Sequence, residues 1–244
     1  MKLLFRRMDF LVLFALFSVL AGIEESVKAG SIEGTVTFIG EIPKSTATDD
    51  AGRRHDLLEV DSKTQGLRYV AVYVTQADGS AVPSQPGVRG ARPPEKLLMN
   101  QVDYAFTPRV LAVQEGEAIT FTNSDPANHN VRTTASNKTN EFNVFTGVDG
   151  KYEHKFRIEP RYHPVRLGCD IHPWMRAWIF VFDHPWFAVT DETGRFSISD
   201  VTPGEFRLHV VQPDIAHREQ RTVRVVANET VKLEIAIRRG ATKH

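Results

Sequence analysis

The chain of 244 residues has little of several things that commonly mark a protein's class. It holds a single cysteine, Cys169, so no disulfide can form within the chain. Basic and acidic side chains number 30 each, so there is no basic excess of the kind that attracts nucleic acid, and we expect no nucleic-acid partner. We find neither heptads nor a low-complexity tract. A disulfide scaffold, a coiled coil and a nucleic-acid-binding module are therefore not expected.

Long hydrophobic runs are also scarce, and the one at the N-terminus is short. The segment "MKLLFRRMDFLVLFALFSVLAG" places three basic residues before an apolar run from Phe10 to Leu20, and small residues follow. This is the form of an export signal, which we assign to residues 1–29. A membrane span needs about 20 apolar residues. The sequence therefore predicts a periplasmic or extracellular protein, with an uncleaved signal anchor as the only membrane span it allows.

Export makes the lone cysteine unusual. A free exposed thiol in an oxidising compartment oxidises or pairs between chains. Either Cys169 is buried and inert, or something occupies its sulfur.

Beyond residue 30 the hydrophobic pattern has period two, which predicts strands. "VRLGC" places Val165, Leu167 and Cys169 on one face, and "WIFVF" is a continuous apolar run typical of a strand buried on both faces. "FAVTDETGRFSI" has the form of a hairpin with its turn at residues 191–194. Residues 43–66 and 76–96 are expected to be surface loops or linkers. The predicted fold class is all-β, built as sandwiches.

The stretch "RLGCDIHPWMRAW" carries the chemistry. Cys169 ends one predicted strand, and His172 and Met175 lie in the loop before the next. "TFTNSDPANHNVRTT" ends another strand near Asn123 and continues into a loop with His129, which can supply a fourth group at the same pole. Two imidazoles, a thiolate and a weak thioether are the ligands of a blue-copper electron-transfer site. The sequence predicts one copper ion, cycling between Cu(I) and Cu(II), which would also keep the thiol occupied.

Residues 97–183 resemble the cupredoxin family of plastocyanin- and amicyanin-like blue copper domains, through the cysteine loop, "HNV" and the strands of "FTPRVLAVQEGEAITFTNSD". The resemblance implies a Greek-key β-sandwich. It also implies binding through Nδ1 of His129 and His172 and Sγ of Cys169, with Met175 axial. Asn123 and Asn130 would hold the two ligand loops together.

In this family the edge of the loop histidine meets partner proteins through an apolar patch. The resemblance implies that His172 is this edge here, with Pro126, Pro173 and Trp174 as patch residues. The other histidines, among them His154, His163 and His184, are interpreted as structural.

Other copper and zinc sites fit the sequence less well. A binuclear copper centre of the oxidase type needs a second cysteine in the loop, and the trinuclear cluster of multicopper oxidases needs paired His-x-His motifs; the sequence has neither. A structural zinc site favours more cysteines and no methionine.

"FAVTDETGRFSISDVTPGEFRLHVV" resembles a carboxypeptidase regulatory-like, or transthyretin-like, module. Such modules begin with two strands that are missing directly before it, while "IEGTV" and "VAVYV" near the N-terminus have the required pattern. Our hypothesis is that a cupredoxin domain (97–183) is inserted into a transthyretin-like sandwich made of residues 31–80 and 184–240. The alternative is a serial arrangement, in which the first strands belong to the copper domain.

The function favoured by the sequence is an exported one-electron carrier that is not itself an enzyme. Its partner would be a redox protein, a cytochrome or a dehydrogenase. The alternatives are a copper-binding adhesion or carbohydrate-associated module, and a copper store or chaperone.

Overall fold

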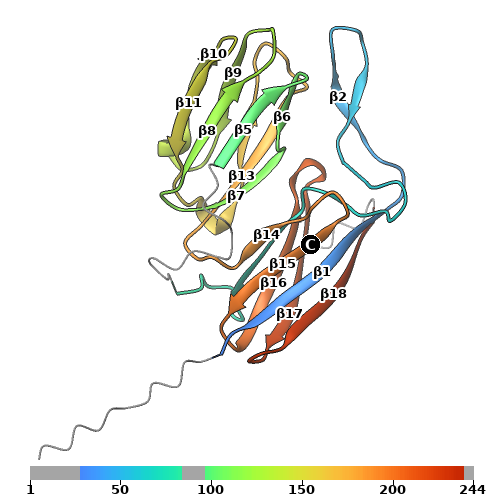
Figure 1. The fold of residues 1–244 in the computed structure, drawn as a ribbon, viewed down its shortest axis with the longest axis vertical. Helices are drawn as coiled ribbons and strands as arrows, with labels where there is room; N and C mark the ends of the chain where they lie inside the picture. The colour runs from blue at the N-terminus through green and yellow to red at the C-terminus, as the bar shows by residue number, and fades with distance from the viewer. Residues whose placement is uncertain (1–27, 84–96, 239–244) are drawn as a thin grey trace, which may run out of the picture.

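The computed structural model describes residues 28–83 and 97–238 (Figure 1). Strands dominate, and the only helices in these ranges are three 3₁₀ turns: η1 (Lys138–Asn140), η2 (Pro160–Tyr162) and η3 (Pro213–Ile215). The predicted all-β class is confirmed. The predicted signal peptide lies outside the described residues, apart from residues 28 and 29. Within the described ranges, no helix has the length and apolar character needed to cross a membrane.

Strands from the two ends of the chain form one sandwich, here called the terminal sandwich. Its first sheet has the order β15 (Arg195–Val201), β1 (Gly30–Ile39), β18 (Thr230–Arg238), and its second has the order β14 (Phe187–Val189), β4 (Ala71–Gln76), β16 (Gly204–Gln212), β17 (His217–Val225). Alternation decides which side chains meet between the sheets. On β16, Phe206, Leu208 and Val210 enter this core, as their period-two spacing predicts.

The middle of the chain forms the second sandwich, here called the central sandwich. One sheet has the order β10 (Asn143–Thr146), β9 (His129–Thr134), β12 (Val165–Gly168), β13 (Arg176–Phe182), β7 (Val110–Gln114). The other has the order β11 (Lys151–Lys155), β8 (Ala118–Asn123), β5 (Leu97–Val102), β6 (Ala105–Thr107). Figure 1 shows it stacked end to end with the terminal sandwich. Val165, Leu167 and Cys169 all enter its core, as predicted.

Strand β13 joins the two sandwiches, and this explains its unbroken apolar sequence. Ile179 and Val181 point into the central core. Phe180 and Phe182 point the other way, into a third apolar cluster shared with β4 and β16, where the rings of Phe182 and Tyr73 lie 4.9 Å apart. The prediction that this strand is buried on both faces is confirmed.

The strand pairing brings together segments from before and after the central sandwich. β1 pairs antiparallel with β15 and parallel with β18. β4 pairs antiparallel with β14 and with β16. This is the pairing that an insertion requires. The domain boundaries at 31–80, 97–183 and 184–240 themselves stay a prediction.

Two local predictions were wrong. Part of the predicted 43–66 loop is a hairpin of β2 (Lys44–Thr48) and β3 (Arg54–Asp56), which Figure 1 shows beside the central sandwich. β14 and β15 do not pair as a hairpin, because they enter opposite sheets of the terminal sandwich. The Asp191 turn between them does form, with Oδ1 accepting from the backbone N–H groups of Thr193 and Arg195. Part of the other predicted loop, residues 84–96, lies outside the described residues.

Candidate metal centre

The structure brings His129, Cys169 and His172 together at the ends of three strands. His129 opens β9, Cys169 directly follows β12, and His172 lies in the loop before β13. Their side chains are 0%, 5% and 7% exposed. Buried imidazoles and a buried thiol at one point need polar partners or a metal ion to compensate for lost hydration.

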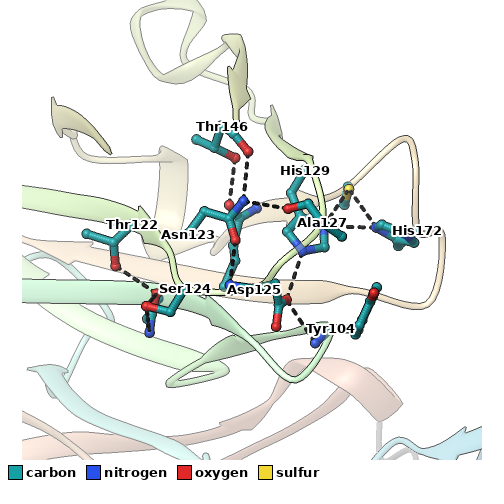
Figure 2. A network of polar contacts seen from close by, with 12 residues as sticks. Tyr104, Thr122, Asn123, Ser124, Asp125, Ala127, His129, Thr146 and His172 are labelled. Atoms are coloured by element: carbon teal, nitrogen blue, oxygen red, sulfur yellow. Dashed lines mark hydrogen bonds and ion pairs between the residues drawn. The ribbon is translucent and has the colours of Figure 1, made fainter. Parts of the chain in front are cut away.

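Their ligand atoms form a small triangle (Figure 2). The two Nδ1 atoms of His129 and His172 are 2.9 Å apart, and Sγ of Cys169 is 3.9 Å from each. Metal–nitrogen bonds to histidine are about 2.0 Å and metal–sulfur bonds about 2.3 Å. Each distance between two ligand atoms is shorter than the sum of the two metal–ligand bonds to those atoms. One ion can therefore contact all three atoms. The residues fit a metal ion.

Met175 is the predicted axial ligand, and that role stays a prediction. It is 2% exposed and belongs to the same buried cluster as Cys169. Its backbone N–H donates to the His172 carbonyl at 2.9 Å, which closes the ligand loop into a tight turn. The side chains of Met175 and Cys169 therefore belong to one apolar cluster.

Asn130 ties the cysteine loop to β9. Its Oδ1 accepts from the Asp170 backbone N–H at 2.7 Å and from the Cys169 thiol at 3.3 Å. Its Nδ2 donates to the side chains of Asn143 and Asp170. A metal would displace the thiol proton, and the bond to Asp170 would then still fix the loop.

Asn123 shapes the loop that delivers His129. Its Nδ2 lies 2.8 to 3.0 Å from the carbonyls of Ala127, Thr146 and Gly147, and its Oδ1 accepts from the Asp125 backbone N–H at 2.9 Å. The side chain is 1% exposed, so these bonds form without competition from water. Figure 2 shows it between the 124–128 loop and Thr146. Asn130 therefore bonds to the cysteine loop, whereas the Asn123 side chain, among the described residues, bonds within the His129 loop and to residues 146–147, and not to the cysteine loop.

The sequence analysis missed Asp125. Its Oδ2 accepts from Nε2 of His129 at 2.8 Å and from the backbone N–H of Tyr104 at 3.0 Å, and the side chain is 4% exposed. Because a carboxylate accepts hydrogen bonds, it keeps the His129 proton on Nε2 and leaves the Nδ1 lone pair facing Cys169 and His172. The only sign of it in the sequence was its position four residues before His129, in a loop whose hydrophobic residues show no regular spacing.

Aromatic rings surround His172. Tyr104 contacts it edge-on with ring centroids 5.1 Å apart, and Trp174 is also at 5.1 Å. The Trp174 indole N–H donates to the Tyr104 carbonyl, and the same ring stacks on His55 of the β2–β3 hairpin at 6.2 Å. Trp174 is therefore half-buried between two histidines. Sequence reasoning missed both Tyr104 and His55, because their segments are distant in the chain.

Electrostatics favour a neutral His172. Burial lowers its pKa, and His129 lowers it further, while Asp50 and Asp125 oppose the shift. A neutral imidazole has the free lone pair that a metal needs.

The predicted patch residues lie around this site with different exposures. Pro126 and Pro173 are exposed, Trp174 is half-buried and His172 is nearly covered. Two further apolar residues are exposed nearby in the chain or in the sheet. Ile171, in the ligand loop, is 49% exposed, and Phe145, which pairs with Asn130, is 65% exposed. Neither was predicted.

Comparison with known protein families and with curated proteins found no match. Among solved structures, a copper-containing nitrite reductase from Thermus scotoductus SA-01 is similar over 41% of this chain, at 22% identity and a TM-score of 0.33. The match covers 25% of that enzyme, so this chain spans about a quarter of it. A reduced amicyanin mutant is similar over 37% of this chain and 86% of its own, at 18% identity and a TM-score of 0.31. Scores this low do not decide the fold or the function.

Proposed function

We propose that the central sandwich is a cupredoxin domain binding one copper ion, and that the protein is an exported one-electron carrier. The observation that carries this is the buried triangle of two Nδ1 atoms and one Sγ, with Met175 in the same apolar cluster as the cysteine. Copper bound there would supply a reversible Cu(II)/Cu(I) couple. His129, Cys169 and His172 would hold the ion, with Met175 as a weak further donor.

The residues around the ligands support fast electron transfer. Asn123, Asn130 and Asp125 fix the ligand loops by hydrogen bonds that do not involve the metal. A site held in one shape needs little rearrangement when the charge of the ion changes. The ligands are nearly closed to water, which favours passage of an electron over binding of a substrate and supports a role other than enzyme.

His172 with Pro126, Pro173 and Trp174 is the proposed exit for the electron. Ile171, in the same loop as His172, is a further exposed apolar residue. A small apolar contact suits a transient complex with a redox protein, a cytochrome or a dehydrogenase.

The surrounding chain is part of the proposal. We infer export to the periplasm or beyond by residues 1–29, and insertion of the cupredoxin domain into a transthyretin-like sandwich. Limited proteolysis tests the insertion. A stable fragment of 184–240 alone would contradict it, because β4 lies between β14 and β16 in one sheet.

Voltammetry tests the carrier role against copper storage. The copper-loaded protein should give a reversible one-electron wave, and Cys169→Ser, which replaces the thiolate by a poor copper ligand, should not. A store or chaperone would instead bind Cu(I) preferentially and release it quickly to a competing chelator. That result, with no reversible wave, would refute the carrier function and leave copper binding intact.

A further inference from the structure

A cleft of about 860 Å³ lies between the two sandwiches. One wall is the outer face of β4, β16 and β17, and the other is the segment around η2 of the central sandwich. Ligand sites of about 300–1,000 Å³ commonly form between domains. None of the residues of this cleft belongs to the metal cluster.

Strand alternation puts polar groups on this wall. Leu208 and Val74 are paired neighbours that enter the core, so the residues one step along each strand face out. The outward pairs are His209 beside Tyr73 and Arg207 beside Thr75. The His209 ring stacks face to face on the buried Tyr73 ring, at 4.6 Å and 1°, so His209 covers Tyr73 on the side of the cleft.

Three arginines line the cleft: Arg161, Arg207 and Arg218. Within the described part of the chain, none of them has a carboxylate oxygen within ion-pair distance of its guanidinium. Arg207 donates to the Ala77 carbonyl at 2.8 Å, and Arg218 contacts Nδ1 of His163 at 3.3 Å. Both contacts are with uncharged acceptors. Hydrogen bonds from Ser80 lower the pKa of Asp78, and Arg207 lies close enough to help lower it.

The acids of the cleft are already engaged elsewhere. Asp183 accepts from the Tyr162 hydroxyl at 2.6 Å. Glu159 accepts from the backbone N–H groups of Ser136 and Asn137 and from the amide of Asn140. Their oxygens therefore serve to hold the fold and form no ion pair with the arginines. Both acids still carry negative charge, so three arginines face two acids in the lining of the cleft.

The arginines add to the effect of burial on two histidines of the cleft, and Glu159 opposes it at His163. Burial, followed by Arg207 and Arg218, lowers the pKa of His209 to about 4. Burial, followed by Arg218 and Arg161, also lowers the pKa of His163. Like charges gathered in a half-enclosed site destabilise one another unless an anion joins them.

We propose that this cleft binds a small organic oxyanion, a phosphate or a carboxylate, through Arg207 and Arg218. Guanidinium groups bind both kinds of oxyanion in bidentate geometry. The His209 ring, stacked on Tyr73, would hold a flat or apolar part of the same molecule, and Arg161 would add charge at the rim. The site is independent of copper.

Calorimetric titration of the whole protein, metal-free and copper-loaded, tests this with inorganic phosphate and with citrate at constant ionic strength. We expect saturable binding at one site per chain, equal in the two forms. Arg207→Gln and Arg218→Gln should each weaken it about tenfold, the loss of one charge-assisted pair. Arg224→Gln, on β17 but outside the cleft, is the matched control and should bind as the wild type. The probe that binds more tightly identifies the oxyanion.

Absence of saturable binding for both probes up to about 10 mM, where even a weak site would fill, would overturn the proposal. Equal weakening by Arg224→Gln would also overturn it, because binding would then follow overall charge. Unfolding curves of the three variants verify the fold, since all three side chains reach solvent. Failure here leaves the copper proposal untouched, and loss of copper binding leaves this one untouched.

Discussion

Replacing the buried carboxylate of Asp125 should loosen the metal centre without dismantling it. Asp125→Asn keeps an oxygen that can accept from both His129 Nε2 and the Tyr104 backbone N–H, since one oxygen, Oδ2, accepts both bonds now. The substitution removes only the charge. Hydrogen bonds to charged groups contribute about 1.5–3 kcal/mol and neutral ones about 0.5–1.5 kcal/mol. The expected loss of about 1–1.5 kcal/mol corresponds to roughly tenfold weaker Cu(II) binding.

The loss should fall more heavily on Cu(II) than on Cu(I), because the more highly charged ion gains more from a nearby anion. A tenfold difference between the two raises the reduction potential by about 59 mV. Competition with a chelator gives the affinity, and voltammetry gives the potential. Asp149→Asn is the matched control, an exposed carboxylate in the neighbouring turn at a φ of 57° that asparagine tolerates. If Asp125→Asn matches the wild type in both affinity and potential, the carboxylate does not orient His129.

Three further predictions concern the ligand loop and the stability of the fold. Met175→Leu should keep the colour of the Cu(II) protein and raise its reduction potential, by removing a weak donor; an unchanged or lower potential on voltammetry would show that the thioether does not reach the ion. Asn123→Ala should lower the free energy of unfolding of the metal-free protein by about 2–4 kcal/mol in urea, because it removes three buried hydrogen bonds to carbonyls and the acceptor of the Asp125 N–H. A loss below about 0.5 kcal/mol would contradict this. Burial lowers the pKa of His184 to about 4. His184 therefore takes up a proton near pH 6.5 in the unfolded chain, but only near pH 4 in the folded chain. The free energy of unfolding falls by up to about 3 kcal/mol as the pH drops through this window. His184→Asn, which keeps an acceptor for the Trp186 N–H, should flatten that slope in metal-free protein. An unchanged slope would mean that the pKa of His184 is the same in the folded and unfolded states.

Local patterns predict much of this molecule, because strand alternation and ligand spacing are properties of short segments. Val165, Leu167 and Cys169 share a face for that reason, and the cysteine loop brings His172 and Met175 to the cysteine through its own turn. His129 was predictable because the strand of "TFTNSD" ends near Asn123, and the loop that follows it carries His129.

What the sequence did not reveal depends on contacts between distant segments. Asp125 reaches His129 within an irregular loop, and Tyr104 reaches His172 across 68 positions of chain whose folding no local period describes. β14 and β15 carry a good turn at Asp191, yet they separate into two sheets because β4 and β1 offer better partners. The β2–β3 hairpin lies in a segment rich in charged and turn-forming residues, where strand propensity is weak.

Addition of Cu(II) to the purified metal-free protein tests the copper site most directly, followed by visible absorption with Cys169→Ser alongside. An intense blue or green band should appear, saturate at one ion per chain, and be missing from the variant, since the colour arises from charge transfer between the thiolate and Cu(II). A wild-type protein that binds Cu(II) without this band, or a Cys169→Ser protein that shows it, would contradict the site described here.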